Sequence, residues 1–92
     1  MTTEHLDSLR ERIDEIDREL LAVLARRRRL VLEVAALKSE RGIPVMQTGR
    51  VAEVLETRGR WAAALGLNSA FARDLFQRVI EEACREEGKT VG

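Results

Sequence analysis

Two basic residues, Arg27 and Lys38, lie on a stripe of a helical pattern that is otherwise apolar. Lys38 follows Arg27 by eleven residues, and eleven steps of about 100° return it to within roughly 20° of Arg27 on one helix face, about 16 Å further along the axis. Two cations with long side chains on one apolar stripe leave room for a small anion between them, so the spacing predicts a small-anion site. The alternative for Arg27 is a buried ion pair or a polar contact that fixes helix register. The apolar members of the stripe are Leu6, Leu9, Ile13, Ile16, Leu20, Val23, Leu30, Val34 and Leu37.

Few other residues could add chemistry to that site. Glu87 lies one helical turn after Ala83 on the same apolar face, which makes it a candidate site residue. The alternative interpretation is that Glu87 is a surface carboxylate at a frayed helix end. Arg50 lies in the first turn of the second predicted helix. Cys84 is interpreted as a small filler rather than a nucleophile, because no histidine lies near it in the sequence. With His5 as the single histidine, no tyrosine and no glycine-rich phosphate loop, the sequence has little equipment for acyl transfer, zinc chemistry or nucleotide binding.

The composition of the 92 residues favours a single all-α domain, 1–92. Hydrophobic residues make up 45% and aromatic residues 3% of the chain, and the dominant Leu, Ala, Arg and Glu are all strong helix formers. Because 16 Lys and Arg residues balance 16 Asp and Glu residues, no net field attracts nucleic acid or anionic lipid. We therefore expect neither nucleic acid nor a membrane as a partner.

Cysteine usage and the lengths of the apolar runs indicate a cytoplasmic protein. One cysteine cannot close an intramolecular disulfide, and without clustered His or Cys it cannot build a zinc site, so we expect no metal and no cofactor. The apolar runs are only a few residues long, far below the roughly 20 residues that span a bilayer. The first residues also lack a basic region followed by an apolar stretch, which a secretory signal would need.

Glycine, proline and capping residues divide the chain into three helices. Gly42 can supply a left-handed cap and Pro44 prevents continuation of the first helix. Gly66 ends the second helix, and Asn68 or Ser69 can cap the start of the third. The predicted elements are a long helix at about 6–41, medium helices at about 49–65 and about 69–87, and a frayed tail at 88–92.

The predicted first helix is too long for a monomer of this size. At 1.5 Å per residue it would measure roughly 54 Å, whereas a compact chain of this length has a diameter of about 32 Å. A second copy that packs along the exposed apolar stripe is the ordinary remedy, and folding and association are then one event. We therefore expect an obligate homodimer.

Beyond these physical arguments, the spacing of individual residues carries a resemblance to a known family. The residues that carry it are Leu9, Arg10, Ile13, Asp14, Ile16, Asp17, Leu20, Leu21, Arg27, Val34, Lys38, Pro44, Val45 and Arg50, and later Gly66, Leu67, Asn68, Phe71, Leu75, Phe76, Val79, Ile80 and Glu81. With this pattern, nearly the whole chain strongly resembles the all-helical chorismate mutases of the bacterial type. The resemblance implies an intertwined three-helix homodimer with two active sites that converts chorismate, a small dianion, to prephenate.

The resemblance also implies a role for each basic residue. Arg27, Lys38 and Arg50 would bind the substrate in one chain, and Arg10 would arrive from the other chain. Arg10 lies seventeen residues before Arg27, some 25 Å away and about 100° off its face, so only a partner's Arg10 could meet it. Arg10 and Arg27 would clamp the carboxylates, and Lys38 would donate to the breaking ether oxygen. Glu87 stands where many family members have a glutamine that donates to the same oxygen, so only its protonated form could replace that donor.

Three positions depart from the common family pattern and leave the substrate open. Val51 stands where a glutamate often reads the C4 hydroxyl of the substrate, Ala83 replaces a frequent serine, and Gln47 replaces an aspartate. The segment 44–51 and the ending 84–87 are similar to 4-amino-4-deoxychorismate mutases of antibiotic pathways. The segments 50–52 and 60–62 are similar to isochorismate pyruvate lyases, which share the fold.

A non-catalytic role is a hypothesis of a different class. A helical dimer with an arginine on its seam could serve as an adaptor or as a regulatory domain that binds a metabolite. A nucleic-acid-binding dimer is disfavoured, because zero net charge and three aromatic residues provide neither a phosphate footprint nor stacking platforms.

Overall fold

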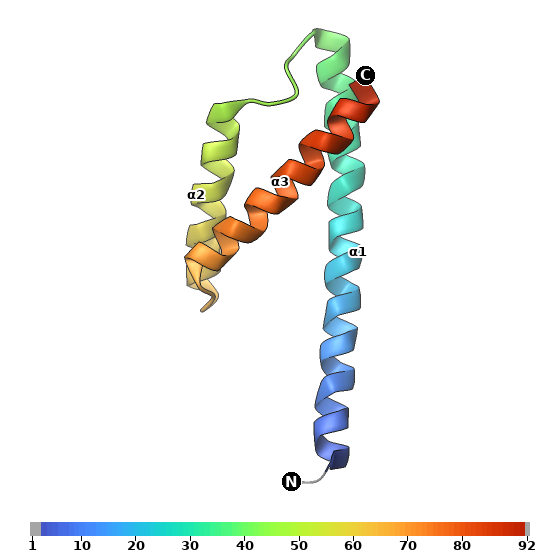
Figure 1. Ribbon diagram of the computed structural model, residues 1–92, viewed down its shortest axis with the longest axis vertical. Helices are drawn as coiled ribbons and strands as arrows, with labels where there is room; N and C mark the ends of the chain where they lie inside the picture. Colours follow the sequence, from blue (N-terminus) through green and yellow to red (C-terminus); the bar gives the residue numbers. More distant parts are fainter. Residues whose placement is uncertain (1–2, 92) are drawn as a thin grey trace. The chain divides into compact units, whose positions relative to one another are not determined.

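The computed structural model confirms the all-α class. It describes the backbone of residues 3–91 and the side chains of residues 5–88. This part of the chain contains no strands and forms three helices: α1 (Thr3–Arg41), α2 (Thr48–Ala64) and α3 (Ser69–Val91) (Figure 1). None of the helices in the described ranges combines the length and apolar character needed to cross a membrane.

The chain divides into two units, Met1–Leu30 and Val31–Gly92. The described part of the first unit belongs entirely to α1. Every side chain described in this unit is exposed except that of the half-buried Arg27. Large apolar side chains such as Ile13, Ile16 and Leu20 are more than half exposed, at 55%, 60% and 53%. Residues 5–30, the part of the first unit whose side chains are described, therefore form no core of their own.

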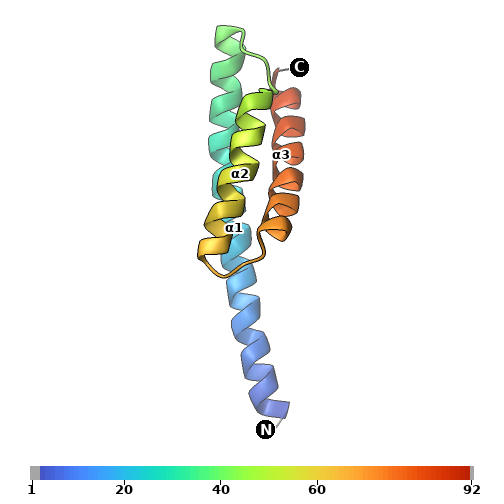
Figure 2. The same cartoon turned by 90° about the vertical axis from the view of Figure 1, so that its left-hand side faces the viewer.

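The second unit holds α2 and α3 side by side, joined by a short turn (Figure 2). Its core consists mainly of small or medium residues, which let helix backbones approach closely. Its buried apolar residues are Ala35, Val54, Gly59, Ala62, Ala72 and Ile80.

Gly59 provides a close approach between α2 and α3. A Cβ atom at this position would lie 2.9 Å from Nε and 3.3 Å from Cγ of Arg73 on α3. The Arg73 side chain therefore crosses α2 where α2 has no side chain. A glycine in the middle of a helix lowers helix stability. At position 59 it leaves room for the Arg73 side chain, which a larger residue would crowd.

Most helix boundaries follow the capping residues. Gly42 adopts φ +68° and the Ile43 N–H donates to the carbonyl of Lys38 at 2.8 Å, which confirms the predicted left-handed cap. Gly66, at φ +81°, closes α2 in the same way. Asn68 is the N-cap of α3, because its Oδ1 accepts from the Phe71 N–H at 2.9 Å.

The predicted position of the C-terminal end of the third helix is wrong. We expected α3 to stop near Glu87 and the tail to fray, but α3 continues through Val91. Gly88 does not adopt a positive φ, so it does not act as a C-cap and the helical turn continues through it. Gly92, the last residue of the expected tail, lies outside the described residues.

Candidate functional site

Lys38 and Glu87 form an ion pair in the second unit. Nζ of Lys38 donates to Oε1 of Glu87 at 3.0 Å, and the two side chains are 16% and 6% exposed. The same Nζ donates to the main-chain carbonyl of Val45 at 2.8 Å. One ammonium group therefore joins the end of α1, the connector that follows it and the last turns of α3.

Local structure brings these groups together. Lys38 lies in the last turn of α1, and the left-handed cap at Gly42 redirects the chain so that Val45 returns to the lysine. Glu87 lies one turn after Ala83 on α3 and is itself 5% exposed. The alternative interpretation of Glu87 as a surface carboxylate is therefore wrong.

Cys84 lies beside this pair. Its thiol is half-buried, which agrees with a filler role. Burial raises the pKa of the Cys84 thiol, the negative charge of Glu87 raises this pKa further, and the positive charge of Lys38 lowers it. The thiol thus senses both charges. The sequence analysis did not link Cys84 to Glu87 and Lys38. The spacing of three residues between Cys84 and Glu87 on one helix could have indicated that the two side chains are neighbours.

Arg50 is in the first turn of α2 and is paired with Glu53. Its Nη1 donates to the Glu53 carboxylate, and the two side chains are 57% and 60% exposed. An exposed pair of this kind holds its partners weakly, so Arg50 can exchange Glu53 for another anion.

The three residues that depart from the family pattern also belong to the second unit. Val51 and Ala83 are half-buried, whereas Gln47 is exposed. Gln47 occupies the N-cap of α2 with an extended backbone and makes no side-chain capping hydrogen bond. The side-chain amide of Gln47 is therefore not engaged in capping α2, and it can reach a ligand.

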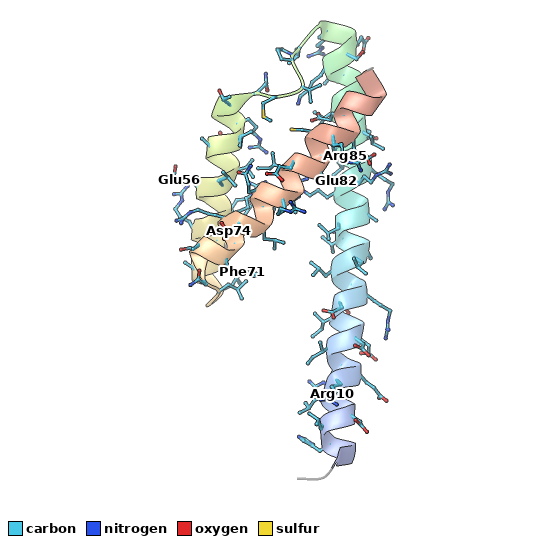
Figure 3. All side chains as sticks on the ribbon, in the orientation of Figure 1. Arg10, Glu56, Phe71, Asp74, Glu82 and Arg85 are labelled. Atoms are coloured by element: carbon cyan, nitrogen blue, oxygen red, sulfur yellow. The ribbon has the colours of Figure 1, made fainter. Side chains whose placement is uncertain are left out.

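Arg10 and Arg27 belong to the first unit. Arg10 is exposed on the early turns of α1 (Figure 3), and Arg27 is half-buried. Their arrangement around Lys38 stays a prediction. The structure thus brings together Lys38 and Glu87, and adds Cys84 and the carbonyl of Val45 to them.

A second polar cluster, on α2 and α3, was missed by the sequence reasoning. The Arg58 guanidinium stacks over Trp61, 4.5 Å from the ring centroid, and lies 5.8 Å from that of Phe76. The spacing of three residues between Arg58 and Trp61 was the available signal. Further along α3, Arg85 pairs with the exposed Glu82 (Figure 3).

Among the described residues, no group of three or more His, Cys, Asp or Glu could hold a metal ion.

The three helices and the buried lysine–carboxylate pair define a class: a small all-α protein with an ion pair between the end of α1 and α3. Comparison with known proteins is more specific. Residues 9–88 match the family chorismate mutase type II, and the chain belongs to that family. It is an enzyme of the chorismate mutase type, an isomerase, and the resemblance inferred from the sequence is confirmed.

Several relatives are 38% to 40% identical to this chain over the aligned residues. A 4-amino-4-deoxychorismate mutase of Streptomyces venezuelae is 40% identical over 82 residues, which cover 89% of this chain and 80% of that protein. An isochorismate pyruvate lyase of Pseudomonas aeruginosa is 38% identical over 85 residues, 91% of this chain and 82% of that protein. A bifunctional chorismate mutase/prephenate dehydratase of Escherichia coli is 38% identical over 84 residues, 90% of this chain but only 22% of that longer protein.

Proposed function

We propose that this protein catalyses the [3,3] rearrangement of chorismate to prephenate. The observation that carries the proposal is the Lys38 ammonium, which is largely buried and held by Glu87 and the carbonyl of Val45. A concerted [3,3] shift moves no proton and forms no covalent intermediate. Catalysis then requires only that the reactive conformer is held and that charge on the breaking ether oxygen is stabilised.

Lys38 is the proposed donor to the ether oxygen. Cleavage of the C–O bond runs ahead of C–C bond formation, so negative charge builds on that oxygen in the transition state. A donor that is already oriented stabilises this charge without reorganising at the moment of reaction. Arg50, whose exposed partner Glu53 holds it weakly, would bind a substrate carboxylate together with Arg27.

Glu87 has two oxygens and therefore two roles in this proposal. Oε1 accepts from Lys38. When the carboxyl group is protonated, its hydroxyl can donate to the same ether oxygen as Lys38, whereas an ionised carboxylate would repel the dianionic substrate. Glu87 would then hold Lys38 through one oxygen and contact the substrate through the other.

A homodimer is part of the proposal. The exposed apolar side chains of residues 5–30, such as Leu9, Ile13 and Ile16, support it, because a helix with such a stripe needs a cover. A second copy would supply that cover, and Arg10 of the partner subunit would then clamp a substrate carboxylate beside Arg27.

A second candidate substrate is 4-amino-4-deoxychorismate. Val51 favours it, because a valine side chain cannot hydrogen-bond to the C4 hydroxyl of chorismate. The mutase from Streptomyces venezuelae is named for this substrate, which supports the same candidate. Loss of one discriminating hydrogen bond costs about 1 to 3 kcal/mol when nothing else satisfies the group.

The test is to incubate the purified protein separately with chorismate, 4-amino-4-deoxychorismate and isochorismate and to identify the products. Prephenate supports the first candidate, the amino analogue of prephenate supports the second, and release of pyruvate from isochorismate supports a lyase. No turnover of any of the three would favour the non-catalytic hypothesis. Arg50→Ala should lower the turnover of whichever substrate is accepted, because Arg50 is proposed to bind a substrate carboxylate. Arg78→Ala, which changes another exposed arginine paired with a glutamate, is its matched control and should leave turnover unchanged.

Val51→Glu tests the choice between the two mutase substrates. The variant should raise kcat/KM for chorismate relative to that for the 4-amino analogue by about 5- to 160-fold, which corresponds to one regained hydrogen bond. An unchanged ratio would show that another residue, with Gln47 as the first candidate, recognises the C4 substituent.

A further inference from the structure

We propose that Gly42 and the main-chain carbonyl of Val45 are positioning groups for the catalytic ammonium of Lys38. The inference rests on the proposed function, because it assigns a purpose to the orientation of Lys38 in the rearrangement. It adds a main-chain clamp, built by the connector between α1 and α2, to the side chains that were expected to form the site.

The connector holds Lys38 at two points. The main-chain carbonyl of Lys38 accepts from the Ile43 N–H at 2.8 Å, which fixes the end of α1. The side chain of the same residue donates from Nζ to the carbonyl of Val45 at 2.8 Å. A lysine has a flexible four-carbon stem, so a single contact would leave the ammonium free to swing, whereas two anchors define its place.

Gly42 makes the second anchor possible. Its φ of +68° lies in the left-handed region, which reverses the chain directly after the helix. The Ile43 donor lies five positions after its Lys38 acceptor, and the Val45 carbonyl follows two positions later. Apart from Gly42 and its two chain neighbours, no described residue has an atom within 4 Å of the position that a Cβ would take at Gly42, so a substitution there acts through the backbone and not through a clash.

The number of donors on Lys38 shows what the clamp achieves. An ammonium group has three N–H donors. Val45 and Glu87 accept two of them, and no residue in the described part of the chain accepts the third. Since the Lys38 side chain is still 16% exposed, the third donor can reach a ligand. The bonds to Val45 and Glu87 therefore restrict the directions in which this donor can point.

The experiment compares two glycines that have the same conformation. Gly42→Ala should lower kcat by about 10- to 100-fold with little change in KM, because a misplacement of about 1 Å in a catalytic group can cost that much. Gly42→Asn should recover much of the lost rate, because asparagine adopts the left-handed conformation more readily than alanine.

Gly66→Ala is the matched control. Gly66 has φ +81°, closes α2 through the same type of cap and also has open space around its Cβ. The two alanine variants therefore introduce similar strain, but the Gly66 variant should keep a kcat close to that of the wild type. Circular dichroism establishes that both variants are folded. An equal loss of kcat in the two variants would overturn the proposal.

A measurement without substrate keeps the inference separate from the proposed function. The chain has two lysines, Lys38 and Lys89, so selective 15N-lysine labelling gives a simple spectrum that Lys38→Arg assigns. In the wild type, the Nζ hydrogens of Lys38 should exchange with water more slowly than those of free lysine. Gly42→Ala should lose this protection and Gly66→Ala should keep it. If Lys38 of the wild type exchanges as fast as free lysine, the clamp is refuted. If the protection is present but no substrate is turned over, the proposed function fails instead.

Discussion

Glu87 accepts a hydrogen bond from Lys38 at 3.0 Å although the two residues lie 49 positions apart in the chain. The Glu87 side chain is 6% exposed and that of Lys38 is 16% exposed, so both charges are largely removed from water. Desolvation opposes such a pair, and its net contribution to folding is small or even negative. What makes the pair energetically important is the cost of losing one member, because the other is then left buried without a partner.

This asymmetry gives the first prediction. Lys38→Met should lower the free energy of unfolding by about 3 kcal/mol, since it leaves Glu87 without its cation. The double variant Lys38→Met/Glu87→Leu should recover most of that loss, because no buried charge remains. Urea unfolding at one fixed protein concentration measures all three proteins, as the stability of a dimer depends on concentration. A double variant no more stable than Lys38→Met would contradict this view of the pair.

The thiol of Cys84 offers a probe of the same environment. Burial raises its pKa above the ordinary value of 9.0, and Glu87 adds to the rise while Lys38 opposes it. At pH 8, native protein should therefore react with iodoacetamide more slowly than the same protein unfolded in urea, because only the thiolate reacts. Mass spectrometry measures both rates. Equal rates in the two states would contradict the raised pKa.

The same shift has a consequence for stability. Since the folded chain holds the Cys84 proton more tightly than the unfolded chain does, the contribution of this thiol is fully present below the unfolded pKa. It is lost as the pH rises from that value through the higher folded pKa. Cys84→Ala should flatten the corresponding part of the curve of unfolding free energy against pH.

The helix ends illustrate how much of the fold could be predicted from sequence. Gly42, Gly66 and Asn68 act on their own turns, so their effects could be inferred from residue type alone. Gly88 shows the limit of that inference, because the same residue type continues a helix when its φ stays negative. Whether a glycine ends a helix depends on the turn around it and not on its identity.

The site was predictable only in part, for a related reason. Periodicity placed Lys38 on an apolar face, and the family resemblance named Glu87 as a site residue. The bond from Lys38 to the carbonyl of Val45 was not predicted, since it depends on the path of an irregular connector. The influence of Glu87 on Cys84 was also missed, although the predicted third helix already contained both residues, three positions apart.

Exchange of subunits tests the shared active site. A chain carrying Arg10→Ala and a chain carrying Arg27→Ala should each be inactive as homodimers. Mixing them with subunit exchange should restore roughly a quarter of the wild-type activity, because half of the dimers are mixed and each mixed dimer has one intact site. The control is the Arg10→Ala chain taken through the same exchange procedure alone, which should stay inactive. If complete exchange restores no activity, Arg10 does not cross between subunits.

The last prediction concerns Glu87 as a second donor to the ether oxygen. A protonated carboxyl group can donate to that oxygen and an ionised one cannot. Glu87→Gln supplies a neutral donor of similar shape that can still accept from Lys38, so this variant should keep at least the wild-type kcat at pH 7. Glu87→Leu can neither donate nor accept and should lower kcat. Steady-state turnover measures both variants, and circular dichroism establishes that both are folded. A glutamine variant as inactive as the leucine variant would show that Glu87 only holds Lys38 and does not donate to the substrate.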